Sequence, residues 1–212
     1  MLRFGPRYRA FSRFVIMESI LNGFQADLAD GVVASIFLHC CCGPCATYTV
    51  KLLREHDFEV SACWYNPNVH PFAEHQKRLE SMQTLAEKVS LPLTIIEGYD
   101  IIDYFRAVVG HESNRCADCY RLRLEKTAEL AREKGFDAFT TSLLISPYQN
   151  HDLLKQIGEE VGRQYGVEFY YQDFRNGFRE SRRMASEFGL YLQKYCGCVY
   201  SEWERYGKVK IT

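Results

Sequence analysis

VVASIFLHCCCGPC, residues 32–45, carries a run of mostly apolar residues into a turn with four cysteines. A continuous apolar, β-branched run of this length is typical of a strand that is buried on both faces. Ala46, Val50 and Leu53 then recur at helical spacing. The sequence therefore predicts a strand over 32–39, a cysteine turn and a helix, in that order.

The same alternation of strand and helix continues along the chain. Strands are predicted over 58–66, 93–98, 136–144 and 167–171, and helices over 72–89, 119–134, 151–162 and, as the last, about 178–188. Such alternation indicates an α/β protein: a single Rossmann-like domain over residues 32–212, with a mostly parallel sheet and helices on both faces. Ligands bind such sheets at the carboxyl ends of the strands, where the cysteine turn is expected.

Composition limits the classes of protein to which the chain can belong. No segment approaches the roughly 18 to 20 apolar residues of a membrane-spanning helix, so we expect no membrane partner and a cytoplasmic location. Residues 1–17 carry arginines but no acidic residue, and they do not resemble a secretory signal. Three interpretations remain for them: a basic arm, an organellar transit segment or a start-codon extension. The net charge is −1, so a nucleic-acid partner needs a local basic patch.

Nine cysteines stand out in a chain without a secretory signal. In a reducing compartment they indicate metal binding or redox chemistry, because structural disulfides are rare there. They fall into three groups and one single residue: Cys40, Cys41, Cys42 and Cys45; Cys116 and Cys119; Cys196 and Cys198; and Cys63.

Four converging thiolates suit either a tetrahedral zinc ion or an iron–sulfur cluster. Cys116 and Cys119 are spaced so that both sulfurs can reach one centre, and their polar surroundings predict a loop. Cys41 and Cys42 are adjacent, so we expect their side chains to diverge, which favours different irons of a cluster, or two different metals, over one zinc ion. Cys63 alternates within a predicted strand and is expected to pack in the core, as free cysteine often does.

Cys196 and Cys198 are separated only by Gly197. A disulfide between them would close a very small ring, and strained disulfides are readily reduced. The glycine gives the backbone the freedom to form that ring. We interpret the two thiols as a redox-active pair; a third pair of metal ligands is the alternative.

Several longer motifs resemble those of a known enzyme family. HCCCGPC (39–45), YNPNVHP (65–71), CADCYRLRL (116–124), SLLISPYQNHDLLKQIG (142–158) and DFRNGFRESRRMASEFGLYLQKYCGC (173–198) resemble, with their spacing, the cobalamin-independent epoxyqueuosine reductases of the QueH type. The resemblance covers about residues 32–201 and leaves residues 1–31 as an N-terminal extension. It implies reduction of epoxyqueuosine to queuosine at the wobble position of tRNA, the last step of queuosine biosynthesis, with the epoxide oxygen leaving as water.

The resemblance also implies roles for the cysteines. A 4Fe–4S cluster would be bound by Cys41, Cys42, Cys116 and Cys119, and the redox-active disulfide pair would be Cys196 with Cys198. A further mononuclear metal, iron, would lie beside the cluster with Cys45 as its thiol ligand. The implied partners are tRNA carrying epoxyqueuosine and an unidentified electron donor.

Cys40 stands where the family more often has an apolar residue. The first ligand pair could therefore be Cys40 with Cys41 or Cys41 with Cys42, and counting back from Pro44 favours the second pair. Cys40 ends the apolar strand and is then expected to point into the core.

Other polar residues are candidates for binding RNA and for proton transfer. Phosphate contacts are expected from basic side chains, base contacts from the turn after the second strand, and protonation of the epoxide oxygen from an acid near the cysteines. The candidates for phosphate contacts are Arg175, Arg179, Arg182 and Arg183 with Arg121 and Arg123. Those for base contacts are Tyr65, Asn66 and Asn68, and those for proton donation are Asp118, His70 and Tyr195.

Two other classes of protein share parts of this pattern. ATP-dependent tRNA thiolation enzymes need a glycine- and serine-rich phosphate cradle after the first strand, whereas this turn has only Gly43 among its thiols, so nucleotide hydrolysis is not expected. A non-enzymatic zinc or iron–sulfur RNA-binding module is the alternative function. The visible absorption of an iron–sulfur cluster would distinguish such a cluster from colourless zinc.

Overall fold

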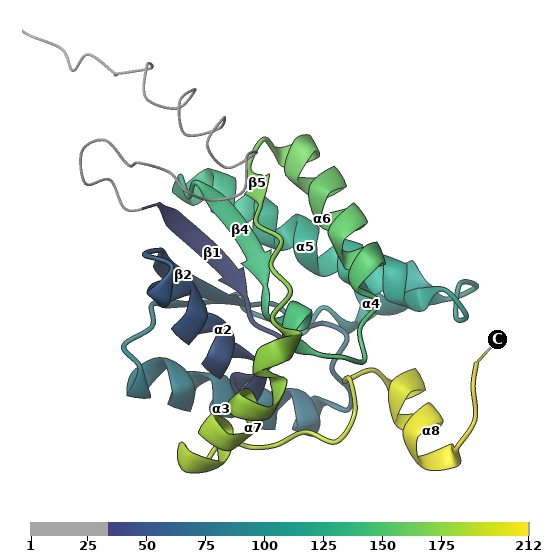
Figure 1. The fold of residues 1–212 in the computed structure, drawn as a ribbon. Helices are drawn as coiled ribbons and strands as arrows, with labels where there is room; N and C mark the ends of the chain where they lie inside the picture. Colours follow the sequence, from purple (N-terminus) through teal and green to yellow (C-terminus); the bar gives the residue numbers. More distant parts are fainter. Residues whose placement is uncertain (1–33, 212) are drawn as a thin grey trace, which may run out of the picture. The chain divides into compact units, whose positions relative to one another are not determined.

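A five-stranded parallel sheet forms the centre of the described chain. The computed structural model describes residues 34–211, and the expected extension over residues 1–31 lies outside them. The strands are β1 (Ser35–His39), β2 (Glu59–Trp64), β3 (Leu93–Ile95), β4 (Ala138–Thr141) and β5 (Glu168–Phe169). They lie in the order β3-β2-β1-β4-β5, and each neighbouring pair is parallel (Figure 1). The predicted α/β, Rossmann-like fold is confirmed.

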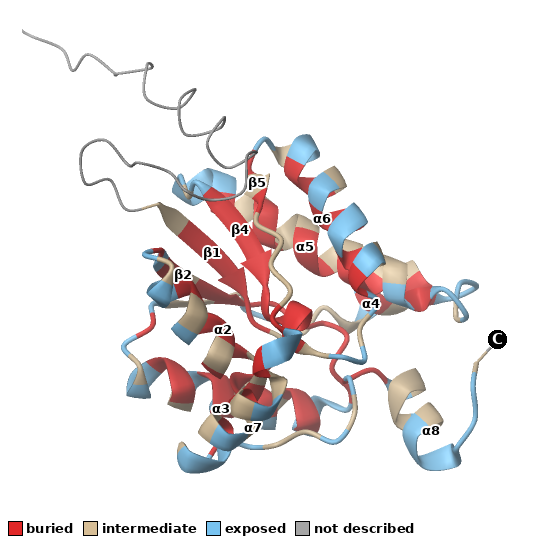
Figure 2. Cartoon of the chain, viewed as in Figure 1, coloured by how far each residue is buried: buried red, intermediate tan, exposed pale blue. Residues whose placement is uncertain are grey.

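Strand β1 lies in the middle of the sheet and is deeply buried. It pairs with β2 from Ser35 to His39 and with β4 from Ile36 to His39. Ile36, Phe37 and Leu38 have no exposed surface, and β1 and β4 are largely buried in Figure 2. A continuous apolar run is needed here because helices cover both faces of the strand.

Seven α-helices accompany the sheet within residues 34–211. Helices α2, α3 and α7 lie on one face and α5 and α6 on the other, with α4 packed against α5 (Figure 1). No helix in this range is both long and apolar enough to cross a membrane. The helix bounds are α2 Gly43–Glu55, α3 Phe72–Lys88, α4 Ile101–Val108, α5 Arg115–Lys134, α6 His151–Tyr165, α7 Phe178–Glu187 and α8 Val199–Gly207.

The local structure differs from the predictions at several points. Helix α5 begins at Arg115, before the start of the helix predicted over 119–134. Cys116, which was expected in a polar loop, therefore lies with Cys119 in the first turns of this helix. Helices α4 and α8 are additional to the predicted elements, so the helix that ends near residue 188 is not the last. Strand β4 ends at Thr141, and a short 3-10 helix, η1 (Ser142–Ile145), takes the place of the predicted end of that strand.

The connections around β1 and β4 create the place for a site. The chain passes from β1 to β2 on one side of β1, whereas β4 joins the sheet on the other side. The carboxyl ends of β1 and β4 therefore form a topological switch point, where loops diverge to the two faces and leave a crevice. The cysteine turn follows β1 directly, and η1 follows β4.

Helix α6 approaches β5 closely at Gly158. A Cβ atom at this position would lie 2.3 Å from two ring carbons of Phe169. Real Cβ atoms do not approach neighbouring atoms this closely, so glycine is required for the packing of α6 on the edge of the sheet.

Candidate active site

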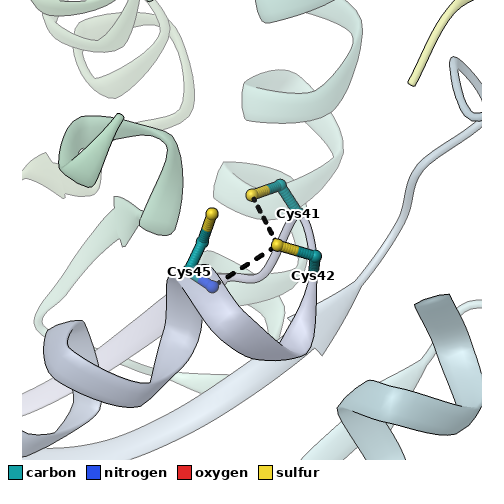
Figure 3. A group of neighbouring side chains, drawn as sticks. All are labelled: Cys41, Cys42 and Cys45. Atoms are coloured by element: carbon teal, nitrogen blue, oxygen red, sulfur yellow. Dashed lines mark hydrogen bonds between the residues drawn. The ribbon is translucent and has the colours of Figure 1, made fainter. Parts of the chain in front are cut away.

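The turn between β1 and α2 gathers three thiols. Cys42 caps the N-terminus of α2, and its Sγ accepts a hydrogen bond from the backbone N of Cys45 at 3.4 Å. The backbone N of Cys41 donates to Ser142 Oγ at 3.0 Å, which ties the turn to η1. The Sγ atoms of Cys41, Cys42 and Cys45 all lie within 4.8 Å of one another (Figure 3). Three thiolates this close together could bind a metal ion.

Hydrogen bonds make the three thiols unequal. Cys41 Sγ lies 3.8 Å from Cys42 Sγ. Side-chain interactions with Cys42 and Cys45 lower the pKa of Cys41 well below the ordinary value, and Ser142 Oγ, at 3.4 Å from Cys41 Sγ, adds to this shift. Burial raises the pKa of Cys42, and the hydrogen bond to Cys41 raises that of Cys45. Gln193 Nε2 also donates to Cys42 Sγ at 2.8 Å. Metal binding by these cysteines would require the thiolate forms and would release the thiol protons.

Cys116 and Cys119 occupy one face of the first turns of α5, because residues three apart on a helix are neighbours. Cys116 is exposed and Cys119 is buried. Burial raises the pKa of Cys119 to about 12. Both line a cavity of about 630 Å³ to which Cys41 and Cys45 also contribute.

The C-terminal pair of cysteines completes the lining of this cavity. Cys196 Sγ accepts a hydrogen bond from Gln149 Nε2 at 3.5 Å, and Gln149 Oε1 accepts one from Tyr120 at 2.6 Å. Cys198 caps α8, where its Sγ accepts from the backbone N of Ser201 at 3.3 Å. Six of the seven predicted site cysteines thus line one cavity, and the seventh, Cys42, lies beside Cys41.

The seven thiols are not equally close together. Within residues 34–211, only Cys41, Cys42 and Cys45 form a group of three potential metal ligands whose ligand atoms lie within 4.8 Å of one another. Cys116 and Cys119 share the cavity with this group but are not members of it. The site therefore contains a tight thiol group and additional thiols from α5 and from the residues before α8.

A buried arginine lies among these thiols. Arg123 is 1% exposed, its Nε donates to Cys119 O at 3.0 Å, and its Nη2 has no hydrogen-bond partner. Burial lowers the pKa of Arg123, but the thiols of Cys119, Cys196 and Cys41 raise it, and the net direction is upward. A buried guanidinium is costly unless a negative group compensates it. The charge of Arg123 and the soft donor set of the cavity therefore fit an anionic metal–thiolate centre.

Two cysteines lie away from the site. Cys40 is fully buried, and its Sγ faces Leu38 O at 3.7 Å within the core. Cys63 is also fully buried and lies 3.7 Å from Thr127 Oγ1. Both were expected to pack in the core, and their burial confirms this. Cys40 therefore lies outside the group formed by Cys41, Cys42 and Cys45.

The polar candidates after β2 are mostly engaged elsewhere. Tyr65 and Asn66 are buried and do not line the cavity, and Asn66 Nδ2 donates to Cys40 O at 2.8 Å, so their role as base readers stays a prediction. Asn68 alone of the three lines the cavity. Its Oδ1 is buried without a hydrogen-bond partner.

The candidate proton donors also have partners. Asp118 lies 3.3 Å from His111 Nδ1. The ring of His70 contacts Pro67 O through Nε2 at 3.1 Å and accepts from the backbone N of Val199 through Nδ1 at 3.4 Å. Tyr195 lines the cavity, but its hydroxyl donates to His70 O at 2.5 Å.

Comparison with known proteins assigns the chain to a family. The family model described as epoxyqueuosine reductase QueH matches residues 36–204. The chain belongs to the QueH family. The match includes all seven cysteines of the site described above.

Relatives within the QueH family are similar over most of their length. The protein named epoxyqueuosine reductase QueH from Dehalococcoides mccartyi is 42% identical over 173 residues, which cover 82% of this chain and 95% of the relative. The one from Thermotoga maritima is 36% identical over 182 residues, covering 82% and 93%. Among solved structures, a protein described as a predicted subunit of a tRNA methyltransferase from Methanocaldococcus jannaschii has a TM-score of 0.49 at 12% identity, covering 73% of this chain and 75% of that one.

Reasoning from the sequence missed several residues of this QueH site. Arg123 was assigned to an RNA surface, yet it is buried beside Cys119. Its position four residues after Cys119 was the available signal, since residues four apart share a helix face. Arg78 and Gln193 were not singled out, because their contacts come from segments distant in sequence.

Proposed function

We propose that this chain reduces epoxyqueuosine in tRNA to queuosine. The observation that carries the proposal is the convergence of six cysteines from three segments on one cavity, in a member of the QueH family. The reaction consumes two electrons and two protons: both carbon–oxygen bonds of the epoxide break, a carbon–carbon double bond forms, and the oxygen leaves as water. A cavity rich in thiols supplies groups that can deliver electrons and protons together.

The proposed cofactor is a 4Fe–4S cluster held by Cys41, Cys42, Cys116 and Cys119. Cysteine thiolates are the usual ligands of such clusters, and the bound cluster would supply one-electron transfer. Arg123 would compensate its negative charge from within the cavity wall. Cys45 completes the tight thiol group and is the proposed ligand of an additional iron beside the cluster.

Cys196 and Cys198 are proposed as the redox-active pair. Oxidation of two thiols to a disulfide releases two electrons and two protons, which is the number that the epoxide consumes. Gln149 holds the Cys196 thiol toward the cavity. An external electron donor would then restore the thiols, and the cytoplasm would keep the other cysteines reduced.

The rim of the cavity has features that suit an RNA strand. Arg182, Lys194 and Arg205 line it and supply positive charge for phosphates. Tyr148 also lines it and is 84% exposed, with its ring 6.1 Å from that of Phe178. An exposed aromatic ring beside a cavity is suited to stacking against an unpaired base.

The other predicted phosphate contacts are weaker candidates. Arg175 makes several hydrogen bonds to Asp173, and Arg183 pairs with Glu187. Arg123 is buried and faces thiols. The proposed RNA contacts therefore centre on Arg182 and its neighbours at the rim.

The test is reduction of substrate by the reconstituted protein. Iron and sulfide are added anaerobically, tRNA containing epoxyqueuosine and a low-potential reductant are supplied, and queuosine is measured by mass spectrometry of the digested tRNA. Wild type and Cys63→Ala should form queuosine, because Cys63 is remote from the cavity, whereas Cys116→Ala should not. Absence of queuosine from wild-type protein with full iron loading would favour the alternative, a non-enzymatic metal-containing RNA-binding module.

A further inference from the structure

The segment that carries Cys196 and Cys198 is attached to helix α3 through one arginine. Arg78 Nη1 donates to Cys196 O at 2.7 Å, and Nη2 donates to Tyr195 O at 3.1 Å. The guanidinium lies 5.2 Å from the centre of the Tyr195 ring. A single planar group thus contacts two consecutive residues immediately before Gly197, and a guanidinium suits such a fork of two hydrogen bonds.

Arg78 is itself held rigidly. It is 2% exposed, and its Nε donates to Glu74 Oε1 at 2.8 Å. Glu74 Oε2 accepts a hydrogen bond from Tyr191 at 2.7 Å, so the carboxylate is also fixed. Because both partners are buried, the arginine has a defined position before it reaches the cysteine segment.

The backbone between the two cysteines lies directly against this arginine. Gly197 has φ +143°, which favours glycine, and a Cβ there would lie 3.0 Å from Val69 Cγ2 and 3.2 Å from Arg78 Nη1. The carbonyl of Gly197 accepts from the backbone N of His70 at 2.8 Å. The turn is therefore held from α3 and from the residues before it, while Cys196 and Cys198 line the cavity.

We propose that Arg78 is a positioning residue that holds the Cys196–Gly197–Cys198 turn in the conformation in which its thiols can pair. The inference rests on the redox role proposed above for these cysteines. When they pair, the S–S bond forms, both S–H bonds break, and two electrons and two protons go to the substrate. The hydrogen bonds of Arg78 to this segment go to the carbonyls of Tyr195 and Cys196, and it acts through these carbonyls.

The physical reason is preorganisation. A disulfide across one intervening residue closes a very small ring, so it needs a particular backbone conformation. If Arg78 fixes that conformation before the reaction, little conformational entropy is lost when the bond forms. Without Arg78 the turn can sample other conformations, and the disulfide becomes less stable relative to the two thiols.

The experiment measures the thiol–disulfide equilibrium of this pair against glutathione. Full-length, cluster-loaded protein is equilibrated anaerobically in mixtures of reduced and oxidised glutathione, and free thiols are alkylated. Trypsin then releases residues 195–205, a peptide that contains Cys196 and Cys198 and no other cysteine. Mass spectrometry of this peptide gives the equilibrium constant for disulfide formation.

Arg78→Gln is expected to lower this equilibrium constant at least tenfold, which corresponds to 1.4 kcal/mol. Arg78→Lys keeps the charge but cannot donate to both carbonyls with one planar group, so its equilibrium constant should lie between those of Arg78→Gln and wild type. The matched control is Arg54→Gln. Arg54 also donates to two consecutive carbonyls, Val89 O at 2.8 Å and Ser90 O at 3.2 Å, but it is exposed and does not line the cavity. Its substitution should leave the constant unchanged.

Two outcomes would overturn the inference, and they have different meanings. An equilibrium constant within twofold of wild type in a folded Arg78→Gln protein would show that Arg78 does not position the pair, while the proposed function would stand. Absence of any disulfide in the wild-type peptide would remove the redox pair itself, and with it this part of the proposed function. If Arg78→Gln does not fold, Glu74→Gln is used in its place. Glu74→Gln weakens the ion pair that holds Arg78 and should also lower the equilibrium constant for disulfide formation.

Discussion

Replacement of Arg123 by methionine is expected to change the stability of the metal-free and the metal-loaded protein in opposite directions. In the metal-free protein the guanidinium is buried, makes one side-chain hydrogen bond to Cys119 O and leaves Nη2 without a partner. Burial of a charge costs several kcal/mol, whereas the lost hydrogen bond contributes about 1.5–3 kcal/mol. Arg123→Met should therefore raise the free energy of unfolding of the metal-free protein by about 1–2 kcal/mol.

In the loaded protein the same change would remove the proposed counter-charge of the metal–thiolate centre. At an effective dielectric constant of about 20, an ion pair separated by about 6 Å is worth about 3 kcal/mol. Loss of even half of this energy would speed the release of iron about tenfold. Arg123→Met should therefore be more stable than wild type without metal and should lose its metal faster.

Both effects can be measured on the same preparations. Thermal unfolding of chelated, thiol-reduced protein should show a Tm higher by roughly 2–8 °C, since 1 kcal/mol shifts Tm by about 2–4 °C in a protein of this size. Release of iron to a coloured chelator should be at least tenfold faster than from wild type. The matched control is Arg121→Met on the same helix, because Arg121 is partly exposed and pairs with Glu160 and Glu125. It should change iron release little.

Either of two results would contradict the proposed role of Arg123. Equal destabilisation of the metal-free and loaded proteins would show that the arginine contributes ordinary packing. An unchanged rate of iron release would show that it does not compensate the charge of the centre.

Four further predictions concern other parts of the molecule. Cys40→Ala should leave the bound iron unchanged, measured by iron analysis, because Cys40 packs in the core; loss of iron would make it a ligand. Gly158→Ala should lower the free energy of urea unfolding by about 1–2 kcal/mol. The new methyl group would collide with the ring of Phe169 in β5, and this cost exceeds the gain of about 1 kcal/mol in helix propensity; a more stable variant would contradict this packing. Arg182→Glu should weaken tRNA binding, measured by filter binding, and the loss should depend on the salt concentration. Arg183→Glu, which does not line the cavity, should weaken binding less, and equal losses would show that Arg182 at the cavity rim has no special role in tRNA binding. Burial lowers the pKa of His39 to about 4, below the 6.5 of the unfolded chain, so its contribution to the free energy of unfolding is present above pH 6.5 and is lost as the pH falls toward 4. The loss between pH 7 and 5 is about 2 kcal/mol. His39→Gln should therefore show a shallower pH dependence of urea unfolding than wild type, and an equal slope would contradict this.

The fold could be predicted from the sequence because its signals are local. The apolar run before Cys40 predicts a central strand, and β1 is that strand. Helix α8 gave no such signal: it begins after Cys198, an unusual capping residue, and none of its residues is buried. The start of α5 was also missed, because the residues around Cys116 are polar and no side chain provides a cap hydrogen bond there.

The candidate site could be predicted only in part. The cysteines were identified from their type and spacing, and six of the seven line one cavity. The buried arginines, Arg78 and Arg123, were not identified as residues of this site, because arginines in a helix usually lie on its exposed face. Their burial depends on contacts between distant segments, such as that of Arg78 with Cys196 O, which no local pattern contains.

The most direct test of the central claim is the iron and sulfide content of Cys119→Ala after anaerobic reconstitution, with Cys63→Ala as the matched control. Both cysteines are buried, but only Cys119 lines the cavity. We expect the iron, the sulfide and the visible absorption of a complete 4Fe–4S cluster in wild type and Cys63→Ala, and their loss in Cys119→Ala. A full cluster in Cys119→Ala would contradict the claim that thiols from the β1 turn and from α5 together hold one metal centre.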